Sequence, residues 1–210
     1  MAFDFKKEYK EFYAPTKKPG IITAPRMKYV AARGQGDPNE ENGAYQRAIN
    51  VLYGVAYTVK MSKMGNYKIP GYFDYVVPPL EGFWRANTHD GLFTGDKSAL
   101  AWISCIRLPD FVTEDVFRWA VEEATRKKKA DFSQAEFLTV EEGLCVQCMH
   151  VGSYDAEPET IAVMRDYAES LGYEFDLSDE RRHHEIYLSD PRRVATEKLK
   201  TVVRLPIREA

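Results

Sequence analysis

The feature that most constrains the fold of this chain is an internal repeat. The segments 101–109 and 200–206 each have the pattern of a strand, and both end in Arg-Leu-Pro. A shorter apolar segment that ends in proline precedes each of them, 75–79 in the first copy and 187–191 in the second. Repeated units of this size bury their apolar faces against each other. The chain is therefore expected to consist of two related halves.

Each copy also begins with the pattern of a strand, a turn and a helix. In the first copy, a strand over 27–34 precedes a helix over 45–59, whose apolar residues recur with the helical period. In the second copy, a strand over 144–151 precedes a helix over 158–172, which has proline in its first turn and glycine at its end. The shared order is strand, helix, strand, strand.

This order predicts an α+β fold made of duplicated βαββ units that pack pseudo-symmetrically. The expected organisation is a single domain over 1–210, with one unit at about 21–109 and the other at about 142–210. A linking helix and its connection occupy 110–141, with Thr113 as the N-cap. A cleft between equivalent elements is a natural ligand site, although a duplication that binds no ligand has the same pattern.

Composition excludes several classes of function. The 29 basic and 32 acidic residues give a net charge of −3, so no basic field exists for direct nucleic-acid binding. No apolar run approaches the roughly 20 residues that span a bilayer, and the first residues lack a secretory signal. Three cysteines do not make a disulfide framework. A cytoplasmic protein without membrane contact is expected.

Motifs for metals and cofactors are incomplete. Cys145 and Cys148 have Cys-x-x-Cys spacing, but residues three apart on a strand point to opposite faces. His183 and His184 are adjacent on a strand and diverge for the same reason. The Gly-Gln-Gly sequence that begins at Gly34 lacks the remaining residues of a phosphate-binding loop. No metal and no organic cofactor are therefore expected.

The expected strand over 183–188 carries the most informative carboxylate. His183, Glu185 and Tyr187 share one face of this strand. If that face meets solvent, Glu185 is an ordinary surface acid. If it lines a cleft, a carboxylate lies beside a phenol among aromatic rings, which is an arrangement suited to chemistry.

Aromatic residues are abundant, with 13 Tyr, 11 Phe and 3 Trp. The segment 79–85 has the pattern of an aromatic-bearing loop, and loop tryptophans often cover ligands. Some of the aromatic residues near it are expected to be ordinary packing residues. The candidates for lining a cleft are Trp84, Trp102, Tyr67, Phe83 and Tyr75, with Glu81 as a second acid.

The segments 79–84, 142–155 and 183–193 together resemble the GyrI-like family of small-molecule-binding domains. The likeness extends from about residue 20 to the end of the chain. It implies a pair of βαββ units around a central aromatic cleft, with an antiparallel sheet and helices on one side. No helix-turn-helix segment precedes the domain, so a stand-alone member is expected, unlike the multidrug-sensing transcription activators that share the domain.

The resemblance also implies a ligand class. The cleft would accept flat, hydrophobic and often cationic compounds beside a central glutamate, which by its position in the motif is Glu185. Some stand-alone members are similar to hydrolases that open the cyclopropane ring of DNA-alkylating natural products and so protect the cell. Other members only bind drugs, or protect DNA gyrase from inhibitors. Family membership does not separate these activities.

The residues support a mechanism for the hydrolase. Glu185 would act as the base that activates water, and either Tyr154 or Tyr187 would orient the water or donate to the developing oxyanion. His183 and the aromatic candidates would hold the planar substrate. The same groups also suit plain binding, because a buried carboxylate and aromatic faces attract lipophilic cations. Hydrolysis is the favoured reading, with drug sequestration or a gyrase interaction as alternatives.

Overall fold

The strand, helix, strand, strand order occurs twice along the chain, and the second half has one additional short strand directly after its helix. The structure, a computed structural model, describes residues 2–86, 92 and 97–210. Its elements, in chain order, are α1 (Phe5–Glu8), α2 (Lys10–Tyr13), β1 (Gly20–Gln35), α3 (Ala44–Lys60), η1 (Met61–Met64), β2 (Leu80–Arg85), η2 (Lys97–Ala99), β3 (Ala101–Leu108), α4 (Glu114–Lys128), β4 (Glu136–Val151), η3 (Tyr154–Ala156), α5 (Glu157–Ser170), β5 (Tyr173–Phe175), β6 (His183–Tyr187), η4 (Thr196–Lys198) and β7 (Lys200–Glu209).

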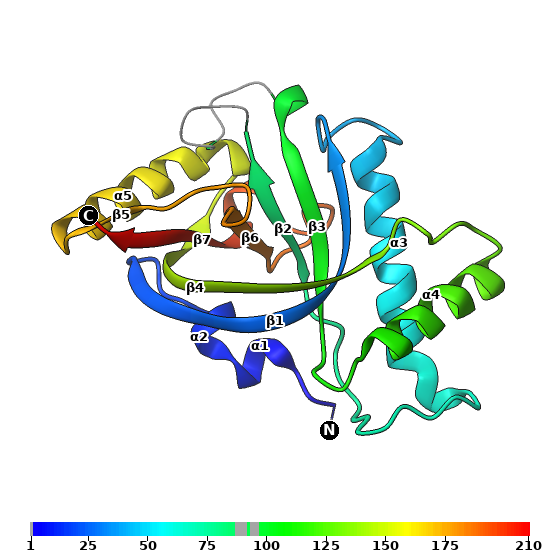
Figure 1. Cartoon of the computed structure of the whole chain (residues 1–210). Coiled ribbons are helices and arrows are strands. Elements are labelled where there is room, and N and C mark those ends of the chain that lie inside the picture. Colours follow the sequence, from blue (N-terminus) through cyan, green and yellow to red (C-terminus); the bar gives the residue numbers. More distant parts are fainter. Residues whose placement is uncertain (1, 87–91, 93–96) are drawn as a thin grey trace.

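The strands form an antiparallel sheet whose ends meet. The order is β4-β1-β3-β2-β6-β7-β5. An additional pairing joins β4 to β7, so six strands form a closed ring, and β5 pairs only with β7. The long strands β1 and β4 pair with each other and curve together (Figure 1). The corresponding strands of the two halves, β2 and β6, also pair with each other. These features confirm the predicted α+β fold of duplicated units.

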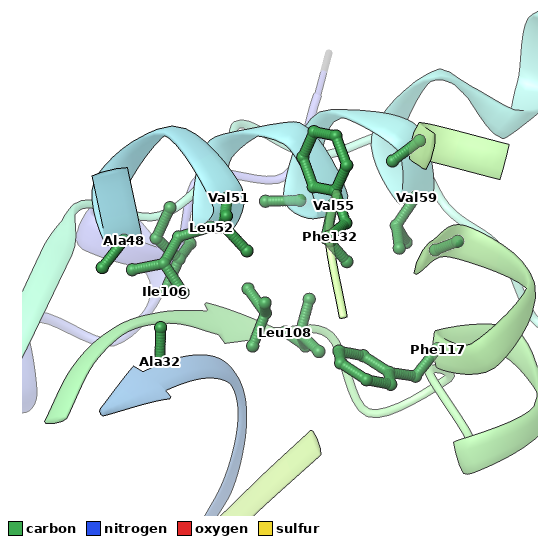
Figure 2. Close-up of a cluster of buried hydrophobic side chains, with 14 of the residues drawn as sticks. Ala32, Ala48, Val51, Leu52, Val55, Val59, Ile106, Leu108, Phe117 and Phe132 are labelled. Carbon is green, nitrogen blue, oxygen red and sulfur yellow. The ribbon is translucent and has the colours of Figure 1, made fainter. Parts of the chain in front are cut away.

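The outer face of the sheet is the face that α3 and α5 cover, and these two helices flank the strands (Figure 1). Figure 2 shows the cluster under α3, where Leu52 and Val55 of the helix meet Ile106 and Leu108 of β3. Each of these four side chains is at most 1% exposed. Burying a leucine or isoleucine contributes roughly 1.5–3 kcal/mol, so this cluster fixes α3 to the sheet.

Helix α4 packs against the same cluster through Phe117 (Figure 2). Its start is as predicted: the Thr113 side chain accepts a hydrogen bond from the Val116 backbone N–H at 3.3 Å. Acidic residues occupy its first turn and basic residues its last, which matches the helix dipole. None of the described helices combines the length and the apolar character that crossing a membrane requires.

The inner face of the sheet has its own core, which includes Tyr29, Phe83 and Ile186. The short helices α1 and α2, which the sequence pattern did not indicate, contribute Phe5 and Phe12 to this core. Helices therefore contact both faces, and the expectation that they all lie on one side holds only for α3, α4 and α5.

Two local predictions were wrong. The expected loop over 79–85 contains strand β2 (Leu80–Arg85), and the expected strand over 75–79 is limited to a single bridge between Tyr75 and Phe3. The reason is the pair Pro78 and Pro79, which have no backbone N–H to donate to a strand partner. The ladder therefore begins only at Leu80, and the partner of β6 is this later segment.

Candidate active site

A cavity of about 610 Å³ opens on the outer face of the sheet. Helix α3 forms one wall, the beginning of α5 and η3 form another, and strands β2 and β6 form the floor. This volume suits a drug-sized compound. The aromatic and ionisable residues that line the cavity include Tyr45, Trp84, Tyr154, Glu157, His183, Glu185 and Tyr187.

The floor of the cavity arises from strand alternation and register. His183, Glu185 and Tyr187 share one face of β6, as predicted, and that face points into the cavity. Across the pairing, Trp84 of β2 lies opposite His183, and Gly82 lies opposite Glu185. Glu185 is thus a cavity residue and not a surface acid, and its side chain is 12% exposed.

Gly82 is the residue that allows this floor to pack. A Cβ atom at this position would lie 2.6 Å from Nε1 of Trp84 and 3.2 Å from the Tyr187 hydroxyl. Any other residue would therefore displace the indole or the phenol. The glycine leaves both rings in place beside Glu185.

A directed chain of hydrogen bonds ends at Glu185. Trp84 Nε1 donates to the Tyr187 hydroxyl at 2.7 Å. Because an indole N–H can only donate, the tyrosine oxygen is the acceptor and its own proton is free for another partner. The Glu185 carboxylate, whose pKa this contact lowers, and the Tyr45 hydroxyl both hydrogen-bond to Tyr187. Trp84 and Tyr187 therefore hold the carboxylate in one orientation.

A second buried carboxyl group, Glu157, meets the first. It lies in the first turn of α5, is 5% exposed, and hydrogen-bonds to Glu185. Glu157, His183 and Glu185 each offer one potential ligand atom, and these three atoms lie within 4.8 Å of one another. All three residue types ligate metals, and this is the cluster in the described part of the chain that could hold a cation. No metal was expected from the sequence.

Burial sets the protonation of this cluster. Desolvation raises the pKa of Glu185 to about 7, although hydrogen bonds from Tyr187 and Glu157 oppose the shift. Desolvation and the charge of Glu185 raise the pKa of Glu157 well above its usual range. Burial and the nearby His184 lower the pKa of His183 to about 3. Near neutral pH, His183 is thus neutral, and the Glu157–Glu185 pair favours a shared proton while the pKa of Glu185 lies near 7.

Aromatic rings line the walls beside these groups. Tyr45 of α3 lies against Trp84 with ring centroids 5.4 Å apart, and Tyr154 meets Tyr187 edge-on at 5.8 Å. Burial raises the pKa of Tyr154 to about 12, so its hydroxyl is a proton donor at neutral pH. The cavity therefore offers flat apolar surfaces and a base in one place.

Two of the predicted cleft residues lie elsewhere on the outer side. Trp102 packs across Gly34 and against Tyr45, with ring centroids 5.1 Å apart, so it supports the wall from behind and does not line the cavity. Tyr67 stacks on Trp119 at 4.2 Å, also away from the cavity. Both were expected to clamp a ligand, and in this structure neither is in a position to do so.

Three further candidates lie on the inner face or next to its core. Strand alternation turns Glu81 and Phe83 of β2 away from the cavity. Phe83 stacks on His184 at 4.0 Å, and Tyr75 is buried in the inner core. Glu81 accepts hydrogen bonds from Tyr13 at 3.2 Å and interacts with His184 at 3.0 Å. These three residues, which were expected in the cleft, therefore do not line the cavity.

The inner face holds a separate polar network with balanced charges. His184 bridges Glu81 and Glu142, and Arg204 pairs with Glu142 at 2.7 Å. Burial opposes ionisation of Glu142, but Arg204 and His184 lower its pKa to about 2. The carboxylates inside the ring thus have cationic partners. Among the described residues, no lysine or arginine forms an ion pair with Glu185 or Glu157.

Sequence reasoning missed Glu157 and Tyr45. A signal for Glu157 was present: it continues the stripe formed by Ile161, Met164 and Ala168 at helical spacing, and the latter two are fully buried. An acid on the buried stripe of a helix is unusual and marks a site candidate. Tyr45 was assigned to the core face of its helix, and the structure places it between that core and the cavity.

Comparison with known proteins identifies the family. A family model described as a GyrI-like small-molecule-binding domain matches residues 17–208. The chain belongs to the GyrI-like family. This match confirms the resemblance seen in the sequence. None of the curated protein sequences matches the chain.

Several solved structures are similar to this chain. An uncharacterised conserved protein from Listeria innocua is 49% identical, with a TM-score of 0.91, and the match covers 98% of this chain and all of that one. A Listeria innocua protein described as a hydrolase is 47% identical, with a TM-score of 0.89 and the same coverage. The C-terminal domain of EcmrR, at 12% identity and a TM-score of 0.54, covering 92% of this chain and 98% of that domain, shares the fold alone.

Proposed function

We propose that the cavity binds planar hydrophobic or cationic compounds and hydrolyses those that carry an electrophilic cyclopropane ring, such as cyclopropanoid DNA-alkylating natural products. The observation that carries the proposal is the state of Glu185: it is a carboxylate at a cavity floor, held by Tyr187, with a pKa of about 7. General-base catalysis is most efficient when the pKa of the base lies near the working pH. The similarity to a Listeria innocua hydrolase supports the reaction class.

The proposed reaction uses water and no cofactor. Glu185 removes a proton from water as the water oxygen bonds to the cyclopropane methylene carbon. The bond between this carbon and the ring carbon breaks, and its electron pair moves through the conjugated dienone to the carbonyl oxygen, which becomes a phenolate. The proton on Glu185 then passes to solvent and the phenolate is protonated, so the sum is substrate plus water.

The two tyrosines take different parts in this proposal. Tyr187 is held between Trp84 and Glu185, so it orients the base. Tyr154 has a protonated hydroxyl at the cavity wall and is the candidate donor to the developing oxyanion. Trp84 and Tyr45 supply faces for stacking the planar substrate.

A mass-spectrometric assay tests the proposal. A cyclopropanoid DNA-alkylating compound is incubated with the protein, with Glu185→Gln, and with Glu159→Gln, an exposed acid on the same helix as Glu157 that serves as a matched control. The expected product is one water heavier, forms over many turnovers, and forms at least about a hundredfold more slowly with Glu185→Gln. The Glu159→Gln protein should match the parent.

Sequestration without turnover is the second candidate. It is favoured by one observation, the absence of a lysine or arginine ion pair to either cavity carboxyl group among the described residues, which suits a cationic ligand. Tight binding of the compound without any hydrated product would support sequestration and refute the hydrolase. Either activity would protect the cell from such compounds.

A further inference from the structure

We propose that one end of the closed strand ring holds a second binding site, which takes a small carboxylate that carries one apolar ring, with Arg182 as its main partner. This end is formed by the last residues of β1 and β2 and by the first residues of β3, β4 and β6. The site lies on the inner face of the sheet, whereas the cavity of the proposed function lies on the outer face. It is therefore separate from that function and does not depend on it.

A hollow of about 310 Å³ opens at this end of the strand ring. Its floor is apolar and consists of Phe83, Ile103, Leu138 and Val140, which belong to the inner core or pack against it. This volume lies at the lower end of the range for small-molecule sites, so it suits a single ring with one substituent.

Three arginines meet above this floor. Arg33 of β1 and Arg85 of β2 belong to the inner face, because they alternate with Ala31 and Phe83 of the inner core. Arg182 directly precedes β6 and lines the hollow together with Arg33. The positive charges of Arg33 and Arg85 both act on Arg182, so the three guanidinium groups converge on one region.

Arg182 is the member of this group with unused hydrogen-bonding capacity. Arg33 donates two hydrogen bonds to Glu136, at 2.7 and 3.0 Å, and Arg85 pairs with Asp179 at 3.2 Å. Arg182 donates through Nε to the Asp179 backbone carbonyl at 2.9 Å. Among the residues that the structure describes, it forms no ion pair, and its two terminal nitrogens donate no hydrogen bond. These two nitrogens lie in one plane and match the two oxygens of a carboxylate.

The surrounding charges favour an anion beside Arg182. Burial lowers the pKa of Arg182, the other two arginines lower it further, and the charge of Asp179 offsets these effects only in part. The remaining acids at the hollow, Glu141 and Glu180, are exposed and are not among the charges that act on Arg182. A bound carboxylate would stabilise the charged form of all three guanidinium groups.

The charges also select a carboxylate over a phosphate. Because Arg33 and Arg85 already have carboxylate partners, the described residues leave one unpaired positive charge at the site. A carboxylate carries one negative charge, whereas a phosphate monoester carries about two at neutral pH. The apolar floor favours a ligand with a ring over inorganic phosphate, which has no apolar part. Benzoate combines the single charge with a ring of suitable size and is therefore the probe.

Methyl NMR with benzoate locates the site. Benzoate is titrated at pH 7 into protein that is labelled at its isoleucine and leucine methyl groups. The bound ring should shift the signals of Ile103 and Leu138, which lie in the floor of the hollow. The signals of Ile49 and Ile161, which line the cavity on the outer face, should keep their positions. Shifts confined to Ile49 and Ile161, or no shifts at all, would overturn the proposal.

Matched probes and variants measure the role of Arg182. Benzoate is expected to bind at least about tenfold more tightly than neutral benzamide and than inorganic phosphate. Arg182→Gln should lower the affinity for benzoate at least about tenfold. Arg182→Lys should lower it less, because lysine keeps the charge but not the planar pair of donors. Arg118→Gln, which changes an exposed arginine on α4, is the control and should match the parent.

Other results of these titrations would overturn the proposal. One is equal affinity for benzoate and benzamide, and another is phosphate that binds as tightly as benzoate. A third is benzoate binding that Glu185→Gln strengthens and Arg182→Gln leaves unchanged, which would assign the anion to the cavity. Circular dichroism shows whether Arg182→Gln folds, and the NMR comparison decides the outcome without any variant. Failure of this site would leave the hydrolase proposal intact, because benzoate and the cyclopropanoid compound are tested on opposite faces of the sheet.

Discussion

Replacing Glu185 with glutamine is expected to stabilise the fold, but only at pH values where the native carboxyl group loses its proton. Burial raises the pKa of Glu185 from 4.5 to about 7. Between these values the unfolded chain binds fewer protons than the native protein, so the free energy of unfolding of the parent protein falls as pH rises. A shift from 4.5 to 7 at 1.36 kcal/mol per pH unit gives a loss of about 3 kcal/mol.

Glutamine has nearly the same shape and is neutral at every pH, so the variant does not suffer this loss. Its advantage over the parent protein is expected to be near zero below pH 4.5, to grow through the window, and to level off at about 3 kcal/mol above pH 7. Urea unfolding followed by circular dichroism, at intervals from pH 4 to pH 8.5, measures this difference. Glu159→Gln, an exposed acid on α5, is the control and should show no such trend.

The shape of the pH dependence decides the outcome. A difference that is the same at all pH values would mean that Glu185 has no raised pKa in the native protein. A variant that is less stable than the parent at pH 8 would mean that the carboxylate has a cationic partner. Either result would refute the electrostatic account of the cavity.

Three further substitutions test the geometry of the site. Gly82→Ala would place a Cβ 2.6 Å from Trp84 Nε1, so the indole must move. The affinity for planar ligands should fall about tenfold in a fluorescence titration. Unchanged affinity would show that the indole position does not depend on Gly82. Tyr187→Phe removes a hydrogen bond that lowers the pKa of Glu185. The rising limb of the pH–rate profile should therefore shift to higher pH by about one unit. A limb that stays at the same pH would show that Tyr187 does not hydrogen-bond to Glu185. Tyr67→Ala should leave ligand affinity unchanged while costing about 1 kcal/mol of stability, and a loss of binding would return this residue to the site.

The sequence was sufficient for much of the fold, because its strongest signals are periodic and local. The apolar stripe of α3 and the Thr113 cap of α4 were both predicted and are both present. Helices α1 and α2 were not predicted, since four-residue helices have too few turns to show a period. The closing pairing of β4 with β7 depends on contacts between distant residues, which no local pattern carries.

The site was predicted where alternation along one strand was sufficient. His183, Glu185 and Tyr187 were placed together because they alternate on β6. Phe83 and Trp84 are neighbours in the sequence but face opposite sides of β2, and this could not be recognised while the segment was read as a loop.

An oxygen-labelling experiment tests most directly whether Glu185 directs a water molecule onto the substrate. The protein, in excess over a cyclopropanoid compound, is allowed a single turnover in water enriched in ¹⁸O, and the product is examined by mass spectrometry. If water attacks the methylene carbon, the new hydroxyl group carries the heavy oxygen in the first turnover. An unlabelled first product would show that the Glu185 carboxylate itself attacks the carbon, and the absence of any hydrated product would contradict hydrolysis altogether.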